Sequence, residues 1–416
     1  MEKYKQIIQD ILDGIERQDY KRGEKLPSIR QLSLQYECSK DTVQKAMQEL
    51  KYQNKIYAVE KSGYYVLDDH DILEEPIDLD LTDFEELPYE DFRICLHQSL
   101  IGRENYLFNY YHQQAGLTEL ITSVQLLLMD YHVYSRKDQL VITAGSQQAL
   151  YILSQLDFGP DRTHILIESP TYTRMEELIR QQGLPYLTIQ RSMEGIDLDR
   201  LEDLFKTGTI KFFYTIPRLH NPLGTSYDRK TMERIVQLAK RYQVYLIEDD
   251  YLADFDGNRQ LPLHYLDKND FVVYIKSFSP TLFPALRIGA VSLPPLLLDA
   301  FLTYKGLIDY DTNLIMQKAL SLYIDNGMFA RNTQLLQEQS LNEEVQIQDL
   351  IKKYPLAYPY QVVRDQLIVQ FPDNPRTARL EGRHQLIRNG TFAYLLLRLH
   401  PHLEDTLKEL STVYKD

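Results

Sequence analysis

Cysteine and long apolar runs are what this sequence has least of. Only Cys38 and Cys95 occur, far apart and outside any metal-ligand spacing, which argues against a structural disulfide or zinc site and fits a reducing compartment. No run approaches the roughly 18 apolar residues of a membrane span, and the N-terminal stretch lacks the uncharged apolar core of a signal peptide. We therefore expect a cytoplasmic protein with neither a membrane partner nor a metal site.

A positive net charge is also missing. The formal charge of −14 argues against general coating of nucleic acid and against attraction to an anionic membrane. The charge is unevenly divided, because residues 1–67 are near +2 and the remainder is about −16. With 416 residues, the chain is also too long for one ordinary domain.

Residues 1–67 read as short helices followed by a hairpin. The first helix has an apolar stripe at helical spacing: Tyr4, Ile7, Ile8, Ile11, Leu12 and Ile15. Ser28 and Gln31 offer a capping box for a second helix, with Leu32 and Tyr36 facing inward, and Ser39 is a good N-cap for a third. The third helix has an apolar face of Val43, Ala46, Met47 and Leu50, and an opposite face of Lys40, Gln44, Lys45 and Gln48. "KIYAVEKSGYYVL" then alternates like two strands around a Lys-Ser-Gly turn.

This order is that of a winged helix-turn-helix domain, and the exposed face of the third helix has donors suited to base edges and phosphates. A small helical dimerisation or capping unit is the alternative that the same periodicity allows.

The stretch "LPSIRQLSLQYECSKDTVQKAMQELKYQNKIYAVEKSGYYV" resembles the DNA-binding domain of GntR-type bacterial transcription regulators. The matching pieces are Leu26-Pro27-Ser28, Arg30, Ser39, Thr42-Val43 and Ser62-Gly63. The resemblance implies DNA contacts from Arg30, Ser39, Lys40, Gln44 and Lys61, with Gly63 shaping the wing. Gln44 departs from the family pattern, in which a basic residue is common at that position.

The next segment, residues 68–90, is dense in carboxylates and contains two prolines, so we expect an acidic linker there. Residues 91–416 then form the large domain. Its short apolar runs are "QLVIT", "HILIES", "IKFFYTI", "VYLIEDD", "FVVYIKS" and "RIGAVSL". Runs of this kind, separated by helical patterns, indicate an α/β domain with a mainly parallel sheet.

Ligands of such sheets gather beyond the carboxyl ends of the strands, and five of these six runs are followed by residues of chemical interest. The first is followed by "AGSQQAL", small residues that open a helix and suit a phosphate. The others are followed by Tyr172, by Asn221, by Asp249 with Tyr251, and by Ser277, Ser279 and Arg287. Asp249 could merely cap a helix and Tyr172 could be a core residue, but packing alone does not account for the whole series.

The series resembles the fold-type I aminotransferase domain that depends on pyridoxal phosphate, and together with the GntR-like head it resembles the MocR class of regulators. The resemblance implies a phosphate seat made by Gly145, Ser146, Gln147, Ser277 or Ser279, and Arg287. It also implies that Tyr172 stacks on the pyridine ring, that Asn221 and Tyr251 contact the ring hydroxyl, and that Asp249 pairs with the ring nitrogen. Tyr111 matches a tyrosine that the other subunit contributes, which implies a homodimer.

One position of the family pattern is replaced. The lysine that forms the Schiff base is Pro280 here, and proline offers no side-chain amine for covalent capture or proton transfer. No catalytic residue is therefore assigned. Lys276 precedes it by four residues, and a phosphate or surface contact is its expected role.

A second departure lies near the C-terminus, where the family uses an arginine to clasp a substrate carboxylate. Leu396 occupies that position, and Arg398 lies two residues further along, on the same face of the expected strand. Arg398 is the remaining candidate for that contact.

Three hypotheses follow. The first is a dimeric regulator of a double-stranded DNA operator whose inactive aminotransferase-like domain senses a small effector: a noncovalent B6 phosphate such as pyridoxal 5'-phosphate, or another anion. The second is an aminotransferase or lyase with an appended DNA-binding domain, and the third is a DNA-binding scaffold without an effector.

Overall fold

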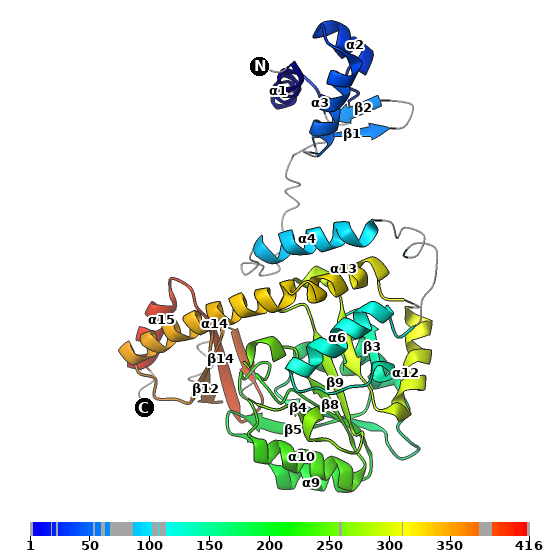
Figure 1. Ribbon diagram of the computed structural model, residues 1–416. Helices are drawn as coiled ribbons and strands as arrows, with labels where there is room; N and C mark the ends of the chain where they lie inside the picture. Colours follow the sequence, from blue (N-terminus) through cyan, green and yellow to red (C-terminus); the bar gives the residue numbers. More distant parts are fainter. Residues whose placement is uncertain are drawn as a thin grey trace. The chain divides into compact units, whose positions relative to one another are not determined.

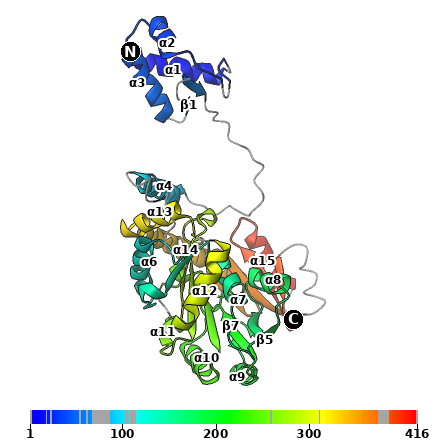
Figure 2. The same ribbon diagram turned by 90° about the vertical axis from the view of Figure 1, so that its right-hand side faces the viewer.

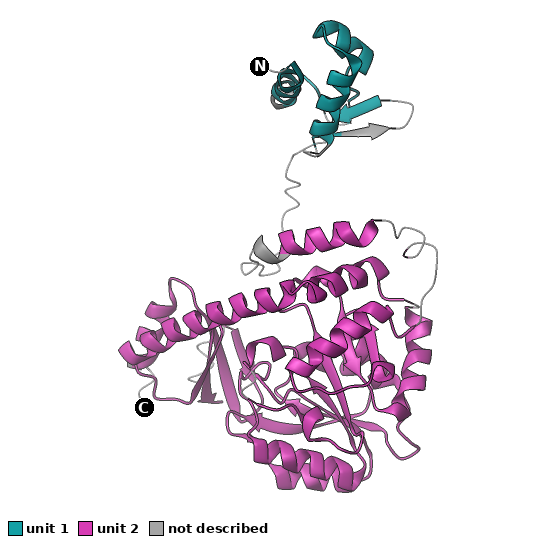
Figure 3. Cartoon of the chain, viewed as in Figure 1, with its two compact units in different colours: residues 1–83 teal, residues 84–416 magenta. Residues whose placement is uncertain are grey.

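The computed structural model describes residues 3–17, 19–21, 24–52, 55–59, 63–66, 86–101, 107, 114–257, 260–309, 311–373 and 385–413. The chain divides into two compact units, residues 1–83 and 84–416 (Figure 3). Among the described helices, none combines the length and the apolar character needed to cross a lipid bilayer.

Unit 1 has the order predicted for a winged helix-turn-helix domain. Helices α1 (Lys3–Glu16), α2 (Ile29–Gln35) and α3 (Lys40–Tyr52) precede an antiparallel hairpin of β1 (Ile56–Val59) and β2 (Gly63–Val66) (Figure 1). The predicted apolar faces meet in one core, whose buried members are Ile7, Ile11, Leu26, Leu32, Val43, Ala46, Met47, Leu50, Ile56 and Val66. The predicted capping box is present, since Ser28 Oγ accepts from Gln31 N at 3.3 Å and Gln31 Oε1 accepts from Ser28 N at 2.8 Å.

An eight-stranded sheet organises unit 2, with the order β3-β10-β9-β8-β7-β4-β5-β6. Its strands are β3 (Leu140–Thr143), β4 (His164–Ser169), β5 (Tyr186–Ser192), β6 (Gly195–Ile196), β7 (Ile210–Thr215), β8 (Tyr245–Asp249), β9 (Val272–Ser277) and β10 (Gly289–Ser292). The pairs from β5 through β4, β7 and β8 to β9 are parallel, while β10 is antiparallel to β9 and to β3. The prediction of a mainly parallel sheet is confirmed.

Helices cover both faces of this sheet (Figure 2). They are α6 (Thr118–Asp130), α7 (Ser146–Gln155), α8 (Thr173–Gln181), α9 (Leu198–Lys206), α10 (Arg229–Tyr242), α11 (Leu263–Leu266), α12 (Pro295–Ile308) and α13 (Leu314–Asp325). Successive side chains of a strand point to opposite faces of the sheet. Tyr214 packs with residues of α7, α8 and α12, whereas Phe213 packs with residues of α9 and α10. Two covered faces explain the nearly continuous apolar runs of the strands.

A second, antiparallel sheet follows near the C-terminus, in the order β11-β12-β14-β13. Its strands are β11 (Tyr360–Val363), β12 (Gln366–Pro372), β13 (Gln385–Arg388) and β14 (Phe392–Arg398), and α15 (Leu403–Val413) packs on it. The long helix α14 (Met328–Lys353) contacts both the region after β9 and the second sheet. Asn332 Nδ2 near its start donates to Thr281 O at 2.6 Å, and Ile347 and Ile351 near its end lie in the core of the second sheet.

The predicted linker is too long at its C-terminal end. Helix α4 (Glu86–Leu100) begins inside it, so residues 86–90 are helical. The helix buries Phe92, Cys95 and Ser99, and it contacts α13. Burial of this face outweighs the local density of carboxylates, and Pro88 is tolerated because it lies in the first turn.

The cap of α2 yields a local stability prediction. Replacing Ser28 by Ala leaves the Gln31 amide without its side-chain acceptor, which costs about 1 kcal/mol. Hydrogen exchange of the α2 amides in the full chain should therefore accelerate several-fold, while exchange in α10 stays unchanged. Gln31→Ala removes the other half of the box, so the double variant should lose less than the sum of the two single losses. Unaltered exchange in α2 would contradict the assignment.

Candidate functional site

The exposed face of α3 is the candidate DNA-binding surface of unit 1. Ser39 caps this helix, since its Oγ accepts from Thr42 N at 3.2 Å. Arg30, Lys40 and Gln44 are exposed, as their predicted role requires. Gly63 begins β2 with a φ of +136°, a conformation that glycine adopts readily. Lys61 lies outside the described residues, and DNA contact by these residues stays a prediction.

Unit 2 has a cavity of about 180 Å³ beyond the carboxyl ends of β3, β4, β7, β8 and β9. Every predicted cofactor residue in the described part of the chain lines it, namely Gly145, Ser146, Gln147, Tyr172, Asn221, Asp249, Tyr251, Ser277, Ser279 and Arg287. Ile216, Pro280 and Pro284 complete the lining. Tyr111 lies outside the described residues. Five separate chain segments therefore converge where the sequence predicted, and their roles as cofactor contacts stay predictions.

One end of the cavity suits a phosphate. Gly145 precedes α7 with a φ of +77°, and Gly145, Ser146 and Gln147 place the start of that helix in the cavity wall. Arg287 lines the same end, and its Nη2 lies 3.4 Å from Ala144 O. A Cβ on Gly145 would lie 3.3 Å from Arg287 Nη2, so glycine is what lets the guanidinium approach the helix start. A cation beside a helix N-terminus is a favourable setting for an anion.

The other end suits a cationic N–H donor. Asp249 is buried, and its Oδ2 accepts from Tyr214 Oη at 2.8 Å, but its Oδ1 has no hydrogen-bond partner among the described residues. Burial raises the pKa of Asp249 to about 7, although the Tyr214 hydroxyl opposes the rise. A protonated ring nitrogen at Oδ1 would satisfy this acceptor and favour its charged form. The residues present therefore fit a pyridoxal phosphate-type ligand.

Buried ion pairs hold the segments that carry Asn221 and Tyr251. Nε and Nη2 of Arg218 donate to the two carboxylate oxygens of Asp250. Tyr274 Oη also donates to Asp250 Oδ2, at 2.7 Å. Asp250 immediately precedes Tyr251, and Arg218 lies in the same turn as Asn221. The pair thus joins the two segments side by side at the strand ends, where bidentate geometry restricts orientation as well as distance.

A second buried cluster was missed from the sequence. Glu168, inside the run of β4, accepts from Arg191 Nη1 at 2.7 Å, from Thr215 Oγ1 at 2.7 Å and from Ile216 N at 3.2 Å. Burial raises the pKa of Glu168, but Arg191, His220 and the Tyr227 hydroxyl together outweigh it, and the pKa falls to about 2. The carboxylate fixes the backbone of Ile216, which lines the cavity. A lone acidic residue in an otherwise apolar strand is the signal that could have revealed it.

The expected phosphate or surface contact of Lys276 is wrong. Lys276 is fully buried, its Nζ lies 2.7 Å from Asp254 Oδ2, and it sits 4.7 Å from the centre of the Tyr131 ring. Side chains alternate along β9, so Ser277 lines the cavity while Lys276 points away from it. The cavity position next to Ser279 belongs to Pro280, which carries no amine.

Arg398 lies in a neighbouring cavity of about 290 Å³ rather than in the first one. Leu396 lines that second cavity with it, which agrees with the prediction that the two share one face of their strand. Arg398 is exposed. Its role as a carboxylate contact stays a prediction.

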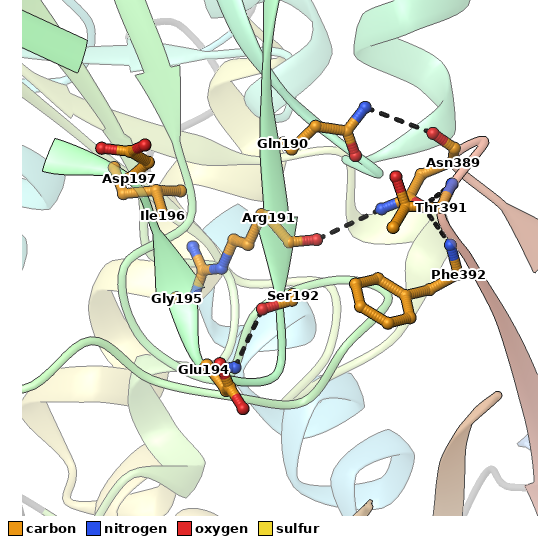
Figure 4. Close-up of a pocket in the computed structure, with 10 residues that line it drawn as sticks. All are labelled: Gln190, Arg191, Ser192, Glu194, Gly195, Ile196, Asp197, Asn389, Thr391 and Phe392. Atoms are coloured by element: carbon orange, nitrogen blue, oxygen red, sulfur yellow. Dashed lines mark hydrogen bonds between the residues drawn. The ribbon is translucent and has the colours of Figure 1, made fainter. Parts of the chain in front are cut away.

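A larger hollow of about 350 Å³ lies between the β5–β6 hairpin and the turn before β14 (Figure 4). Its polar groups join the two sheets: Gln190 Nε2 donates to Asn389 O at 3.2 Å, and Asn389 Nδ2 donates to Arg191 O at 3.4 Å (Figure 4). No predicted site residue lines it. The hollow is thus a seam between the sheets.

Comparison with known proteins assigns both units. Residues 3–66 match the gntR family of bacterial regulatory proteins, and residues 97–354 match aminotransferase class I and II. HTH-type transcriptional regulator YcxD of Bacillus subtilis is 39% identical over 361 residues, which are 85% of this chain and 81% of that protein. The probable rhizopine catabolism regulatory protein MocR of Rhizobium meliloti is 28% identical over 237 residues, 56% of this chain and 45% of that protein.

Among solved structures, kynurenine aminotransferase of Pyrococcus horikoshii, in complex with PMP, superposes with a TM-score of 0.68. The alignment covers 78% of this chain and 85% of that chain, at 21% identity. A likeness at this identity supports the fold.

The buried Oδ1 of Asp249, which has no hydrogen-bond partner among the described residues, predicts that this residue lowers the stability of the ligand-free fold while it favours ligand binding. The folded-state pKa of Asp249 lies above the unfolded value, so its ionisation costs folding free energy as pH rises from about 4 to about 7. Asp249→Asn should stabilise the ligand-free chain increasingly over that range and level off above it, by up to about 4 kcal/mol at about 1.4 kcal/mol per pKa unit. Urea unfolding across pH measures this. Asp299→Asn, an exposed control on α12, should change nothing; a pH-independent effect of Asp249→Asn would refute the shift.

Proposed function

The chain belongs to the MocR-type regulators, in which a GntR-family head is joined to an aminotransferase class I and II domain, and from this premise we propose what the second domain does. The protein is a transcription regulator whose head binds DNA. Its aminotransferase-like domain holds a vitamin B6 phosphate noncovalently, catalyses no reaction and changes operator binding when the ligand is present.

One observation carries this proposal: the cavity retains its ligand groups but has lost the amine. Asp249 Oδ1 is an unsatisfied buried acceptor, and Arg287 flanks the start of α7. A bound pyridoxal or pyridoxamine phosphate would meet a charge partner at both ends. Pro280 stands where covalent capture requires an amine, and Lys276 is committed to Asp254. The structural neighbour from Pyrococcus horikoshii was solved with PMP, a ligand of the same class.

The aminotransferase alternative requires an amine that reaches the ligand. Withdrawing Lys276 from its pair would leave Asp254 charged and unpaired in the core, which costs about 3–5 kcal/mol. No compensating contact in the described cavity favours that exchange. The scaffold alternative provides no ligand that would satisfy the buried Oδ1 of Asp249.

A homodimer is the proposed assembly. Its support is the apolar side of α12, where Leu296 is 85% and Leu307 is 80% exposed. Tyr304 and Ile308 add to the same helix. Several large apolar side chains exposed together on one helix are typical of a surface that another protein covers.

Ligand binding is tested by titrating the full chain with pyridoxamine phosphate and pyridoxal phosphate. Both should bind, and borohydride should attach neither to the protein. Asp249→Asn should weaken both at least tenfold, because it removes the charged partner of the ring nitrogen. Pro280→Lys is the gain-of-function counterpart: borohydride should then fix pyridoxal phosphate to residue 280.

Three results would count against this proposal. Attachment of pyridoxal phosphate to Lys276 of the unaltered chain would refute noncovalent binding. Absence of binding by either compound, with the chain folded, would remove the B6 phosphate altogether. Steady turnover of an amino acid would restore the enzyme alternative.

DNA binding is tested by the salt dependence of affinity for a short duplex. Arg30→Ala and Lys40→Ala each remove one predicted phosphate contact, so each should weaken binding and reduce the slope of log K against log salt by about 0.9. Lys51→Ala is the matched control, since it is exposed at the far end of α3. A slope unchanged in the first two variants would exclude them from the interface. Comparing operator affinity with and without pyridoxamine phosphate tests the effector role, and equal affinities would favour the scaffold.

A further inference from the structure

A separate cavity of about 210 Å³ lies at the end of β9 opposite to Ser277, where Val272 begins that strand and Ser292 ends β10. Among the described residues, none lines both this cavity and the one beyond the carboxyl ends of the strands. The proposed function does not use it. Its walls combine two tyrosine rings, two carboxylates, a histidine and a few apolar side chains.

The two tyrosine rings are the exposed part of this wall. Tyr134 is 57% and Tyr265 is 43% exposed, and their ring centres lie 6.1 Å apart with the planes tilted by 53°. The ring of His132 packs edge-to-face on Tyr265, also at 6.1 Å, which restricts that side chain. The faces of aromatic rings carry negative charge density and attract cations within about 6 Å of the ring centre. Two adjacent rings that are left accessible therefore favour a positively charged ligand.

The two carboxylates of the wall belong to Asp267 and Asp270. Asp267 is fixed by backbone amides, since its Oδ1 accepts from Asn269 N at 2.9 Å. Its Oδ2 accepts from Phe271 N at 2.6 Å and from Val272 N at 2.9 Å. Asp270 is exposed and has a φ of +58°. A side chain that the backbone already holds loses little freedom when a ligand binds, so Asp267 is a preorganised negative charge.

The charge of this wall is negative. No lysine or arginine in the described part of the chain lines the cavity. Arg136, whose charge interacts with Asp270, is itself paired with Asp138, and its Nε lies 2.9 Å from Oδ1. The histidine of the wall shows the sign of the local field, because burial lowers the pKa of His264 while Asp267 and Asp270 oppose that fall. The cavity therefore favours cations and disfavours anions.

His264 is held in place by hydrogen bonds on two sides. Its Nε2 lies 3.3 Å from Ser292 Oγ, which in turn lies 2.7 Å from Ser135 Oγ. Its backbone N–H donates to Glu248 Oε2 of β8 at 2.9 Å. Apolar side chains at the adjoining strand ends, among them Leu293, complete the wall. An alkyl group can pack on this apolar part while a charged head stays beside the rings and carboxylates, as long basic side chains do on protein surfaces.

We propose that this cavity binds an organic cation, an ammonium or guanidinium group on an alkyl stem, with its charge beside the rings of Tyr134 and Tyr265 and the carboxylates of Asp267 and Asp270. The rings and the carboxylates both attract the charged head. The apolar part of the wall suits the stem, which a metal ion lacks. The site is independent of the proposed B6 phosphate, and it gives the domain a second ligand at the opposite end of β9.

The test measures binding of n-butylammonium, n-butylguanidinium and neutral n-butanol to the full chain by ligand-observed NMR. Each cation should bind at least tenfold more tightly than n-butanol, and salt should weaken the cations alone. Tyr265→Leu should weaken cation binding at least threefold, whereas Tyr265→Phe should retain it because phenylalanine keeps the ring face. Asp270→Asn should weaken it as well, and asparagine tolerates the positive φ, so the turn is preserved. Asp299→Asn, exposed on α12, is the matched charge control and should change nothing.

Equal binding of n-butanol and the two cations overturns this proposal, and so does cation binding that is unchanged in both Tyr265→Leu and Asp270→Asn. N-acetyl-lysine-methylamide distinguishes two sources of the same chemistry. If it binds as tightly as n-butylammonium, the cavity takes a basic side chain of another protein, and if it binds at least tenfold more weakly, the cavity takes a free amine. Either result supports the cation site. Titration with pyridoxamine phosphate should be unaltered in these variants, so the proposed function stands or fails separately.

Discussion

The carboxyl ends of β3, β4, β7, β8 and β9 meet at one edge of the large sheet, and the candidate site depends on that meeting. Parallel pairing sets the direction of neighbouring strands and therefore brings residues distant in sequence to a common place. Asp249 and Ser277 are the last residues of their strands, so a change of register in β8 or β9 would move a cavity residue directly. The apolar layers on both faces of the sheet keep the register fixed.

Buried charges give this edge its finer geometry. The pairs Glu168–Arg191, Arg218–Asp250 and Lys276–Asp254 all lie beneath or beside the cavity with little or no exposed surface. Such pairs contribute little net stability compared with apolar replacements, but removing one partner is expensive. Their effect is thus to fix orientation: one supports Ile216, one joins the Asn221 and Tyr251 segments, and one anchors the end of β9. A site that binds without reacting still needs its groups held in place.

The sequence predicted the parts of the molecule where local pattern and tertiary burial agree. Doubly covered strands such as β7 and β8 each contain a run of buried apolar residues, and the small residues before α7 mark a helix start near the end of β3. Strand β5 was not foreseen, because most of its side chains are not fully buried and its apolar run is broken by Thr188, Gln190 and Arg191. Of the C-terminal sheet only β14 was foreseen: β12 was missed although it buries residues on both faces, and the outer strands β11 and β13 are short and only partly buried.

Two single residues show where sequence reasoning ends. Lys276 reads as a strand-end lysine, and only the packing of Tyr131 and Asp254 on that side of β9 reveals it as a core residue. Arg364, in the turn between β11 and β12, gives no signal at all, because a left-handed φ and proximity to the cavity that Arg398 lines are properties of the folded turn. Both depend on contacts between segments far apart in the chain, which neither propensity nor periodicity encodes.

Helix α14 has 26 residues, so it is about 39 Å long at 1.5 Å per residue. Asn332 and Gln337 tie its first half to the turn after β9 and to the segment of Asp254, and Ile347 and Ile351 tie its second half to the C-terminal sheet. Helix α14 is therefore attached in its first half to the region of Pro280 and in its second half to the sheet that carries Arg364. If the C-terminal sheet moves away from the large sheet, α14 has to tilt or bend. The distance between the two sheets at the site is therefore coupled to the orientation of α14.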